Sequence, residues 1–175
     1  MSEPGTRWIT ASERLQLRAF TLADAAWVLP MLNDAAFLEH VGDKGVRSIA
    51  DAERYLTDGP LASYLAHGFG LSAVVRASDG EPVGMAGVIT RPTLPAPDIG
   101  YAMRPTMRGS GYGFEAAAMA LAYGHRDLGF PQLLAIVNPG NTASRQILAR
   151  LGFRHESMHR PPDGTKEVEL HVHDA

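Results

Sequence analysis

The stretch Arg108-Gly109-Ser110-Gly111-Tyr112-Gly113-Phe114-Glu115-Ala116 decides how the rest of the sequence is interpreted. Three glycines in five positions lead into an alanine-rich run, residues 116–122, with a strong helix propensity. Glycine permits positive φ and close backbone approach, and the first N–H groups of a helix have no partners within the helix. The stretch therefore predicts a loop that binds an anion, most often phosphate, or else a glycine turn that only caps a helix.

The composition is that of an ordinary globular protein. The chain has 175 residues, 45% hydrophobic and 20% charged, which predicts one domain over residues 1–175 with residues 1–12 as a flexible tail. A net charge of −3 gives no general attraction to nucleic acid or to an anionic membrane. Cysteine is absent, which excludes disulfides, thiolate nucleophiles and Cys-ligated zinc. We expect a cytoplasmic protein, monomeric or homodimeric, without a signal peptide or a membrane span.

Hydrophobic periodicity, turn residues and capping signals predict the secondary structure. Strands are expected at 14–20, 69–77, 82–90, 98–104, 132–137, 153–159 and 167–173. Helices are expected at 21–33, 48–66 and 142–151, and a further helix, with Glu115 in its first turn, is expected to run from the glycine loop to about residue 128. Polar or turn-forming loops are expected at 39–45, 78–81, 91–97, 138–141 and 161–164.

The order of these elements predicts the fold class. An antiparallel meander is followed by a strand–helix–strand unit and a closing hairpin. That order predicts an α/β (α+β) domain with a mixed, mostly antiparallel sheet of about six or seven strands, flanked by about four helices.

Two common nucleotide-binding motifs do not fit the glycine loop. A Walker loop needs Gly-Lys followed by Ser or Thr, which the loop lacks. A dinucleotide fingerprint needs a later third glycine and an acidic residue about 20 positions on, where this chain has the apolar run 133–137. The pattern that remains is Arg/Gln-x-x-Gly-x-Gly/Ala, matched by Arg108, Gly111 and Gly113.

With this pattern the sequence resembles the GNAT superfamily of acyl-CoA-dependent N-acetyltransferases. The stretch Asp98-Ile-Gly-Tyr-Ala-Met-Arg-Pro105 looks like that family's strand before the loop. The stretch from Asn141-Thr-Ala-Ser-Arg145 to Leu151-Gly-Phe153 looks like its later helix, and the opening Glu13–Arg18 is also typical. The resemblance covers nearly the whole chain and indicates the branch that contains the ribosomal-protein alanine N-acetyltransferases.

The resemblance implies acetyl-CoA as co-substrate, with no metal. The residues expected to bind its pyrophosphate are Arg108 and, through their N–H groups, Gly109, Ser110, Gly111, Tyr112 and Gly113. In this family the strands here around 98–104 and 132–137 splay apart, and the pantetheine arm pairs with main chain around Ala102, Met103 and Arg104. Asn141 would hydrogen-bond the arm or its water, or it is simply a turn residue. Ser144 is expected beside the sulfur.

The resemblance also implies direct attack of a neutral amine on the thioester in a ternary complex. The oxyanion donor is expected to be the main-chain N–H near Met103. Many relatives protonate the thiolate with a Tyr four residues before the glycine that ends the helix. That position is Leu148 here, so Ser144 becomes the candidate acid or a group that only positions the sulfur.

The general base and the acceptor are left open by the sequence. Asp98 is a candidate base through water, or only a strand-end carboxylate in solvent, and His40 and Asp43 lie where this family builds its acceptor pocket. His171 and His173 share a strand face but lack a third metal ligand. The acceptor is expected to be a protein N-terminus or a small amine. The alternatives are transfer of another acyl group, or a CoA-binding regulator without turnover.

Overall fold

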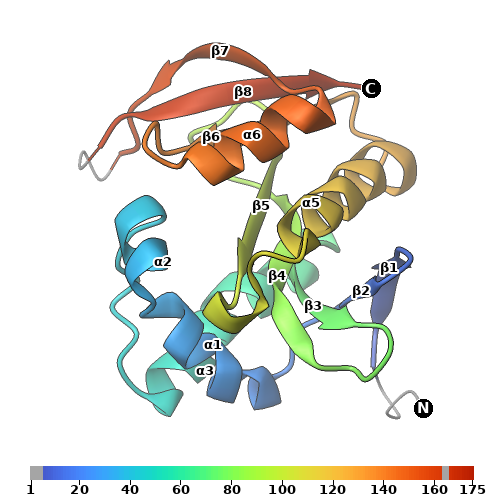
Figure 1. The fold of residues 1–175 in the computed structure, drawn as a ribbon, viewed down its shortest axis with the longest axis vertical. Coiled ribbons are helices and arrows are strands. Elements are labelled where there is room, and N and C mark those ends of the chain that lie inside the picture. The colour runs from blue at the N-terminus through green and yellow to red at the C-terminus, as the bar shows by residue number, and fades with distance from the viewer. Residues whose placement is uncertain (1–5, 163–165) are drawn as a thin grey trace.

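The computed structural model describes residues 6–162 and 166–175 and arranges them around one mixed sheet (Figure 1). The sheet has eight strands within those residues, in the order β1-β2-β3-β4-β5-β6-β8-β7. Neighbouring strands are antiparallel except β5 and β6, which are parallel. The strands are β1 (Trp8–Ala11), β2 (Leu15–Arg18), β3 (Leu71–Arg76), β4 (Pro82–Ile89), β5 (Asp98–Met103), β6 (Gln132–Val137), β7 (Arg154–His159) and β8 (Val168–Asp174).

The predicted α/β class with a mostly antiparallel sheet is confirmed, but the strand count of six or seven is too low. The additional strand is β1, within the region 1–12 that we expected to be a flexible tail. Its Thr10 pairs with Leu17 of β2, and the Ala19 N–H donates to the carbonyl oxygen of Arg7 at 2.9 Å. Residues 1–5 lie outside the described part of the chain.

Six α-helices occur in the described residues, against about four predicted. They are α1 (Ala25–Leu32), α2 (Ala35–His40), α3 (Ile49–Leu56), α4 (Ala62–His67), α5 (Tyr112–Ala122) and α6 (Thr142–Leu151). A π-helical turn, Thr57–Leu61, joins α3 to α4, so the single helix predicted at 48–66 is one continuous helical run. Within this part of the chain, no helix is both long enough and apolar enough to cross a membrane.

Helix α2 overlaps the start of the loop predicted at 39–45. Asp34 is its N-cap, and the carboxylate accepts a hydrogen bond from the Phe37 N–H at 3.3 Å. The Phe37 side chain is buried, which ties this short helix to the core. A capping residue without a strong apolar period after it was too weak a signal to predict the helix.

The helices cover the two faces of the sheet. Trp27 of α1 and Leu56 of α3 pack with Met85 on one face, in the lower part of Figure 1. Met119 of α5 packs with Val74 on the other face. Helix α6 lies in the upper part of the molecule with β6, β7 and β8, and β5 runs between that part and α1 to α3 (Figure 1).

Both predicted hairpins are present. Strands β3 and β4 pair antiparallel, and Gly80 adopts a φ of 75° in the turn that joins them. Strands β7 and β8 also pair antiparallel. Of the turn predicted at 161–164, Asp163 and Gly164 lie outside the described residues.

Asp24 holds the N-terminal segment together. Its buried carboxylate accepts hydrogen bonds from both Arg18 Nη atoms at 2.8 and 2.9 Å, from the Thr21 N–H at 2.9 Å and from Trp27 Nε1 at 2.8 Å. Burial by itself raises the pKa of Asp24, but these hydrogen bonds outweigh it and lower the pKa overall. The carboxylate thereby connects β2, the capping box formed by Thr21 and Asp24, and α1.

We predict that Asp24→Asn lowers the free energy of unfolding by about 2–4 kcal/mol, because Arg18 loses its buried partner. Because the pKa of Asp24 is lower in the native state than in the unfolded chain, the ionised carboxylate stabilises the fold at pH values above the unfolded pKa of about 3.9. That stability is lost as the pH falls through the native pKa. Urea unfolding at pH 7 and pH 3 checks both points. The variant should lose less stability on acidification than the parent does.

The matched control is Asp79→Asn. Asp79 accepts hydrogen bonds from Arg76 at 2.6 and 3.0 Å, but on the surface of the β3–β4 turn. Because exposed ion pairs contribute little, this variant should lose much less stability than Asp24→Asn. Equal losses for the two variants would contradict a special role for Asp24.

Candidate functional site

A cavity of about 580 Å³ lies where β5 and β6 separate. Its walls come from α2 and the residues after it (37–44), from β5, from the end of β6 and from the first half of α6. The structure therefore brings the predicted acceptor loop, Asp98, Asn141 and Ser144 to one cavity.

The separation of β5 from β6 follows from their pairing. These two strands pair at one position, Asp98 with Leu134, and the Leu134 N–H donates to the carbonyl oxygen of Pro97 at 2.9 Å. Beyond that point, β5 has no strand on its β6 side within the described residues. The predicted splay is confirmed, and it leaves backbone donors and acceptors of β5 available to a ligand.

Alternation along β5 tells which backbone groups face the gap. The Arg104 N–H donates to the carbonyl oxygen of Val83 on β4 at 2.9 Å. Since successive residues of a strand direct their N–H and C=O groups to opposite sides, Ala102 also faces β4, whereas Tyr101 and Met103 face the gap. Of the residues predicted to pair with an extended ligand, Met103 is thus directed toward it, while Ala102 and Arg104 are directed toward β4.

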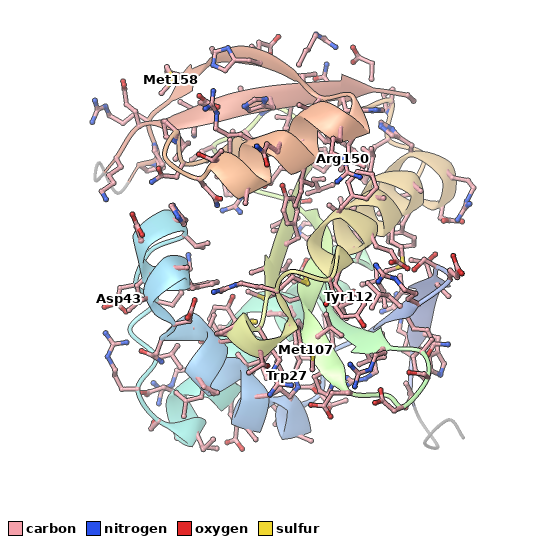
Figure 2. The ribbon with its side chains drawn as sticks, viewed as in Figure 1. Trp27, Asp43, Met107, Tyr112, Arg150 and Met158 are labelled. Carbon is pink, nitrogen blue, oxygen red and sulfur yellow. The ribbon has the colours of Figure 1, made fainter. Side chains whose placement is uncertain are left out.

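The glycine loop ends at the start of α5, between Met107 and Tyr112 (Figure 2). Gly109 and Gly111 have φ angles of 86° and 80°, in the left-handed region that favours glycine. Gly111 is the N-cap of α5, and no side chain caps the helix there. The first N–H groups of α5 are therefore available to an anion.

Arg108, a predicted phosphate ligand, makes a different contact in this structure. Its Nη2 atom lies 2.7 Å from Asp34 Oδ2 and donates to the carbonyl oxygen of Met103 at 3.3 Å. The hydrogen bond from Arg108 lowers the pKa of Asp34. Because Asp34 caps α2, this ion pair links the glycine loop to the helix that lines the cavity.

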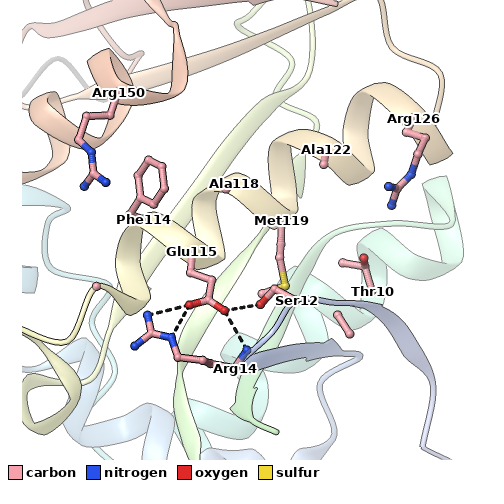
Figure 3. A pocket seen from close by; sticks show the side chains of 12 residues that line it. Thr10, Ser12, Arg14, Phe114, Glu115, Ala118, Met119, Ala122, Arg126 and Arg150 are labelled. Carbon is pink, nitrogen blue, oxygen red and sulfur yellow. Dashed lines mark hydrogen bonds and ion pairs between the residues drawn. The ribbon is translucent and has the colours of Figure 1, made fainter.

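Glu115, in the first turn of α5, has a structural role. Its carboxylate accepts hydrogen bonds from Ser12 Oγ at 2.6 Å, from the Arg14 N–H at 3.0 Å and from Arg14 Nε at 2.7 Å (Figure 3). These bonds fix the β1–β2 turn against α5. Burial by itself raises the pKa of Glu115, but the bonds lower it overall.

A second cavity, of about 500 Å³, runs along the outer side of α5 from Gly111 (Figure 3). Arg150 of α6 lies over the ring of Phe114, with its guanidinium carbon 3.9 Å from the ring centroid. Arg126 also lines this cavity. The sequence contained no signal for this groove, because its walls come from β1, α5 and α6.

Two of the predicted site residues lie at the start of α6. Asn141 is the N-cap, and its Oδ1 accepts a hydrogen bond from the Ser144 N–H at 3.1 Å. Ser144 Oγ lies 2.7 Å from the hydroxyl oxygen of Tyr101 on β5. Tyr101 was not among the predicted site residues. The alternation of β5, which gives it the same face as Met103, was the available signal.

Asp98 is fully buried, which does not match the alternative of a solvent-exposed strand end. Arg91 Nε lies 3.0 and 3.1 Å from its two carboxylate oxygens. Burial nevertheless raises the pKa of Asp98 to about 6, with Arg91 opposing that shift. A carboxylate with this pKa can accept a proton near neutral pH.

The two other candidate bases differ in their surroundings. Asp43 lines the cavity, but its side chain is exposed and is paired with Arg47 at 2.5 Å. His40 lines the cavity, and its Nδ1 is buried with no hydrogen-bond partner among the described residues. Asp98 and His40 therefore stay candidates, whereas the hydrogen bond from Arg47 lowers the pKa of Asp43 and makes it a weaker base.

The predicted histidine pair does not form a metal site. His171 Nε2 lies 2.9 Å from Glu169 Oε2, and His173 Nδ1 lies 2.9 Å from His125 Nε2. Across residues 6–162 and 166–175, no three His, Cys, Asp or Glu residues are grouped so that they can hold a metal ion.

Comparisons with known proteins agree with this geometry. A family model described as an acetyltransferase (GNAT) domain matches residues 14–154. An acetyltransferase from Agrobacterium tumefaciens str. C58 has a TM-score of 0.80 at 22% identity, covering 100% of this chain and 96% of that one. RimL, a ribosomal L7/L12 alpha-N-protein acetyltransferase in complex with coenzyme A, has a TM-score of 0.78 at 17% identity, covering 96% and 98%. At these identities the likeness shows the fold.

A curated relative matches over a shorter stretch. YkkB of Bacillus subtilis (strain 168), an uncharacterized protein, is 29% identical over 97 residues. That match covers 53% of this chain and 56% of YkkB, so the chain spans little more than half the length of this relative.

We predict that Gly111→Asp weakens the affinity for acetyl-CoA at least about tenfold, a cost of about 1.4 kcal/mol. The aspartate would add negative charge among the free N–H groups at the start of α5. Folding should persist, because the nearest atom to an added Cβ is the flexible end of Arg14, at 3.4 Å. Titration calorimetry measures the affinity.

Gly129→Asp is the matched control. Gly129 lies beyond the other end of the same helical run, has a φ of 75° and has no atom within 4 Å of the position that an added Cβ would take. The substitution therefore has the same backbone strain and the same charge, but it lies away from the loop. We expect unchanged affinity. An unchanged affinity of Gly111→Asp would contradict the loop assignment.

Proposed function

The chain belongs to the GNAT acetyltransferase family, and on that premise we propose that it transfers the acetyl group of acetyl-CoA to a primary amine. The amine attacks the thioester directly in a ternary complex, without a covalent intermediate. The observation that carries the proposal is the gap between β5 and β6. There, unpaired backbone of β5 and the predicted catalytic side chains of Asp98 and Ser144 meet at one cavity.

The residues present fit coenzyme A. The pyrophosphate would accept hydrogen bonds from the N–H groups of residues 109–113, with the α5 dipole favouring its charge. The pantetheine amides would pair with the gap-facing main chain of Tyr101 and Met103. The groove along α5 begins at Gly111, so the nucleotide would extend from the pyrophosphate toward Phe114 and Arg150. An aromatic ring and a guanidinium there suit an adenine and a phosphate.

The two faces of β5 would carry different catalytic groups. Asp98 and Tyr101 are an odd number of residues apart, so their side chains project from opposite faces of the strand. Asp98 would accept the proton of the incoming ammonium through water, while the Met103 N–H, directed into the gap, would stabilise the oxyanion. Ser144, hydrogen-bonded to Tyr101, would lie beside the sulfur. The amine and the thioester would thus meet in the gap from opposite sides.

The acceptor would bind against α2 and the residues that follow it. These residues form the wall of the cavity opposite α6, and they carry both charge signs, with Glu39 and Asp43 beside His40 and Lys44. RimL, named as acting on the alpha-N position of a ribosomal protein, supports a protein N-terminus as one acceptor class. A small amine is the other. The alternatives are a regulator that binds CoA without turnover, or transfer of a different acyl group.

A panel of amines tests the proposal. N-terminal peptides, polyamines, amino sugars and free amino acids are incubated with acetyl-CoA, and the released thiol is followed with DTNB. We expect turnover with at least one acceptor, and slower turnover with Gly111→Asp when acetyl-CoA is limiting. A protein that binds acetyl-CoA in calorimetry but acetylates no member of the panel would support the regulator instead.

We predict that kcat/KM of the parent falls as the pH drops below about 6, because Asp98 must be ionised to accept a proton. Asp98→Asn should lower kcat/KM by about 100-fold or more and remove that acidic limb. The pH–rate profiles of both proteins check this. Asp43→Asn is the control, and we expect it to keep the acidic limb.

The melting temperature of Asp98→Asn shows whether Asp98 has a catalytic or a structural role. Burial makes native Asp98 bind its proton more tightly than the unfolded chain does, so its ionisation lowers stability once the pH exceeds the unfolded value of about 3.9. The neutral Asn should therefore not lower the melting temperature at pH 7. A loss of activity that is matched by a loss of folding would contradict the assignment of Asp98 as the base.

A further inference from the structure

A hydrogen bond between two hydroxyl groups joins β5 to α6 within the cavity where β5 and β6 separate, which we call the main cavity. The Tyr101 hydroxyl oxygen lies 2.7 Å from Ser144 Oγ and 3.3 Å from the Ser144 carbonyl oxygen. Both residues line the cavity. The 2.7 Å separation is that of a strong O–H···O hydrogen bond. The two residues are 43 positions apart in the sequence.

The local geometry fixes Ser144 in place for this bond. Asn141 accepts a hydrogen bond from the Ser144 N–H, so the backbone of Ser144 is held in the first turn of α6. A phenol is a stronger hydrogen-bond donor than an aliphatic alcohol, and its shorter contact is to Ser144 Oγ. With the phenol donating to Oγ, the hydrogen of Ser144 is free to point into the cavity.

Ser144 by itself is a poor acid for a leaving thiolate. An aliphatic alcohol holds its proton more tightly than a thiol or a phenol does, so a lone serine would be left as an unfavourable alkoxide. The position four residues before Gly152 is Leu148, whose buried side chain has no proton to give. A second hydroxyl bonded to Ser144 reduces this difficulty, because a phenol holds its proton less tightly than an aliphatic alcohol does.

We propose that Tyr101 is the positioning residue of Ser144 and the source of the proton that Ser144 passes to the departing sulfur. The inference rests on the proposed acetyl transfer and adds to it the residue that completes the acid. As the C–S bond breaks, its electron pair goes to sulfur, which takes the Ser144 proton. Ser144 Oγ takes the phenolic proton of Tyr101. Water in the cavity reprotonates the phenolate, and the proton lost by the ammonium balances this step.

The environment of Tyr101 suits this role. Burial raises the pKa of Tyr101 to about 12, although the hydrogen bond with Ser144 opposes the shift. The phenol is therefore protonated throughout the neutral range and always holds the proton to be given. Because the same burial disfavours the phenolate, return of the proton to that state is thermodynamically favoured.

Tyr101→Phe tests the proposal, since it removes the hydroxyl and keeps the ring. We expect kcat with the best amine of the panel to fall about 10–100-fold, with KM for acetyl-CoA changed less than about twofold. The double variant Tyr101→Phe/Ser144→Ala should be no slower than Ser144→Ala, because the two hydroxyls act as one unit. Additive losses, or an unchanged kcat of Tyr101→Phe, would overturn the proposal.

Tyr123→Phe is the matched control. The Tyr123 ring packs against the same core cluster as Tyr101, but it does not line the main cavity. We expect parental kcat from this variant, and parental melting temperatures from both Phe variants. If the parent protein acetylates no amine, the proposed function and this inference both fail. If the parent turns over and Tyr101→Phe equals it, the inference alone fails.

Discussion

The incomplete pairing of two parallel strands is the constraint on which the rest of this structure depends. Strands β5 and β6 share one paired position, Asp98 with Leu134, and then separate. An extended segment with unpaired N–H and C=O groups needs other partners, so the gap is suited to a ligand with amides of its own. Asp98 and the start of α6 both line the cavity at this gap, which makes it the natural position of the reaction.

The alternation of β5 gives the gap two chemically different sides. Side chains of Tyr101 and Met103 project toward α5 and α6, while Asp98 projects from the other face and is paired with Arg91. One strand can thus present a buried carboxylate to an amine and a hydroxyl pair to a thioester. The ion pair of Arg108 with Asp34 adds a connection from the glycine loop to α2, on the acceptor wall.

Much of the fold could be predicted because its signals are local. Helix α5 follows from glycines before an alanine-rich run, and the β3–β4 hairpin follows from Asp79-Gly80 between two apolar runs. The errors occurred where local signals are weak. Strand β1 depends on pairing with β2, and the short helix α2 depends on the burial of Phe37. In both cases, contacts with the rest of the fold outweigh the preference of the segment itself.

The sequence by itself determined the order of elements, the glycine loop and the resemblance that indicates acetyl-CoA, since each depends on residues adjacent along the chain. Only the tertiary structure decided the partner of Ser144, the burial of Asp98 and the contact of Arg108 with Asp34. The physical reason is that hydrogen bonds and desolvation act through space. Tyr101 and Ser144 become neighbours only when β5 and α6 pack together, and the pKa of Asp98 rises only when the folded chain excludes water from it.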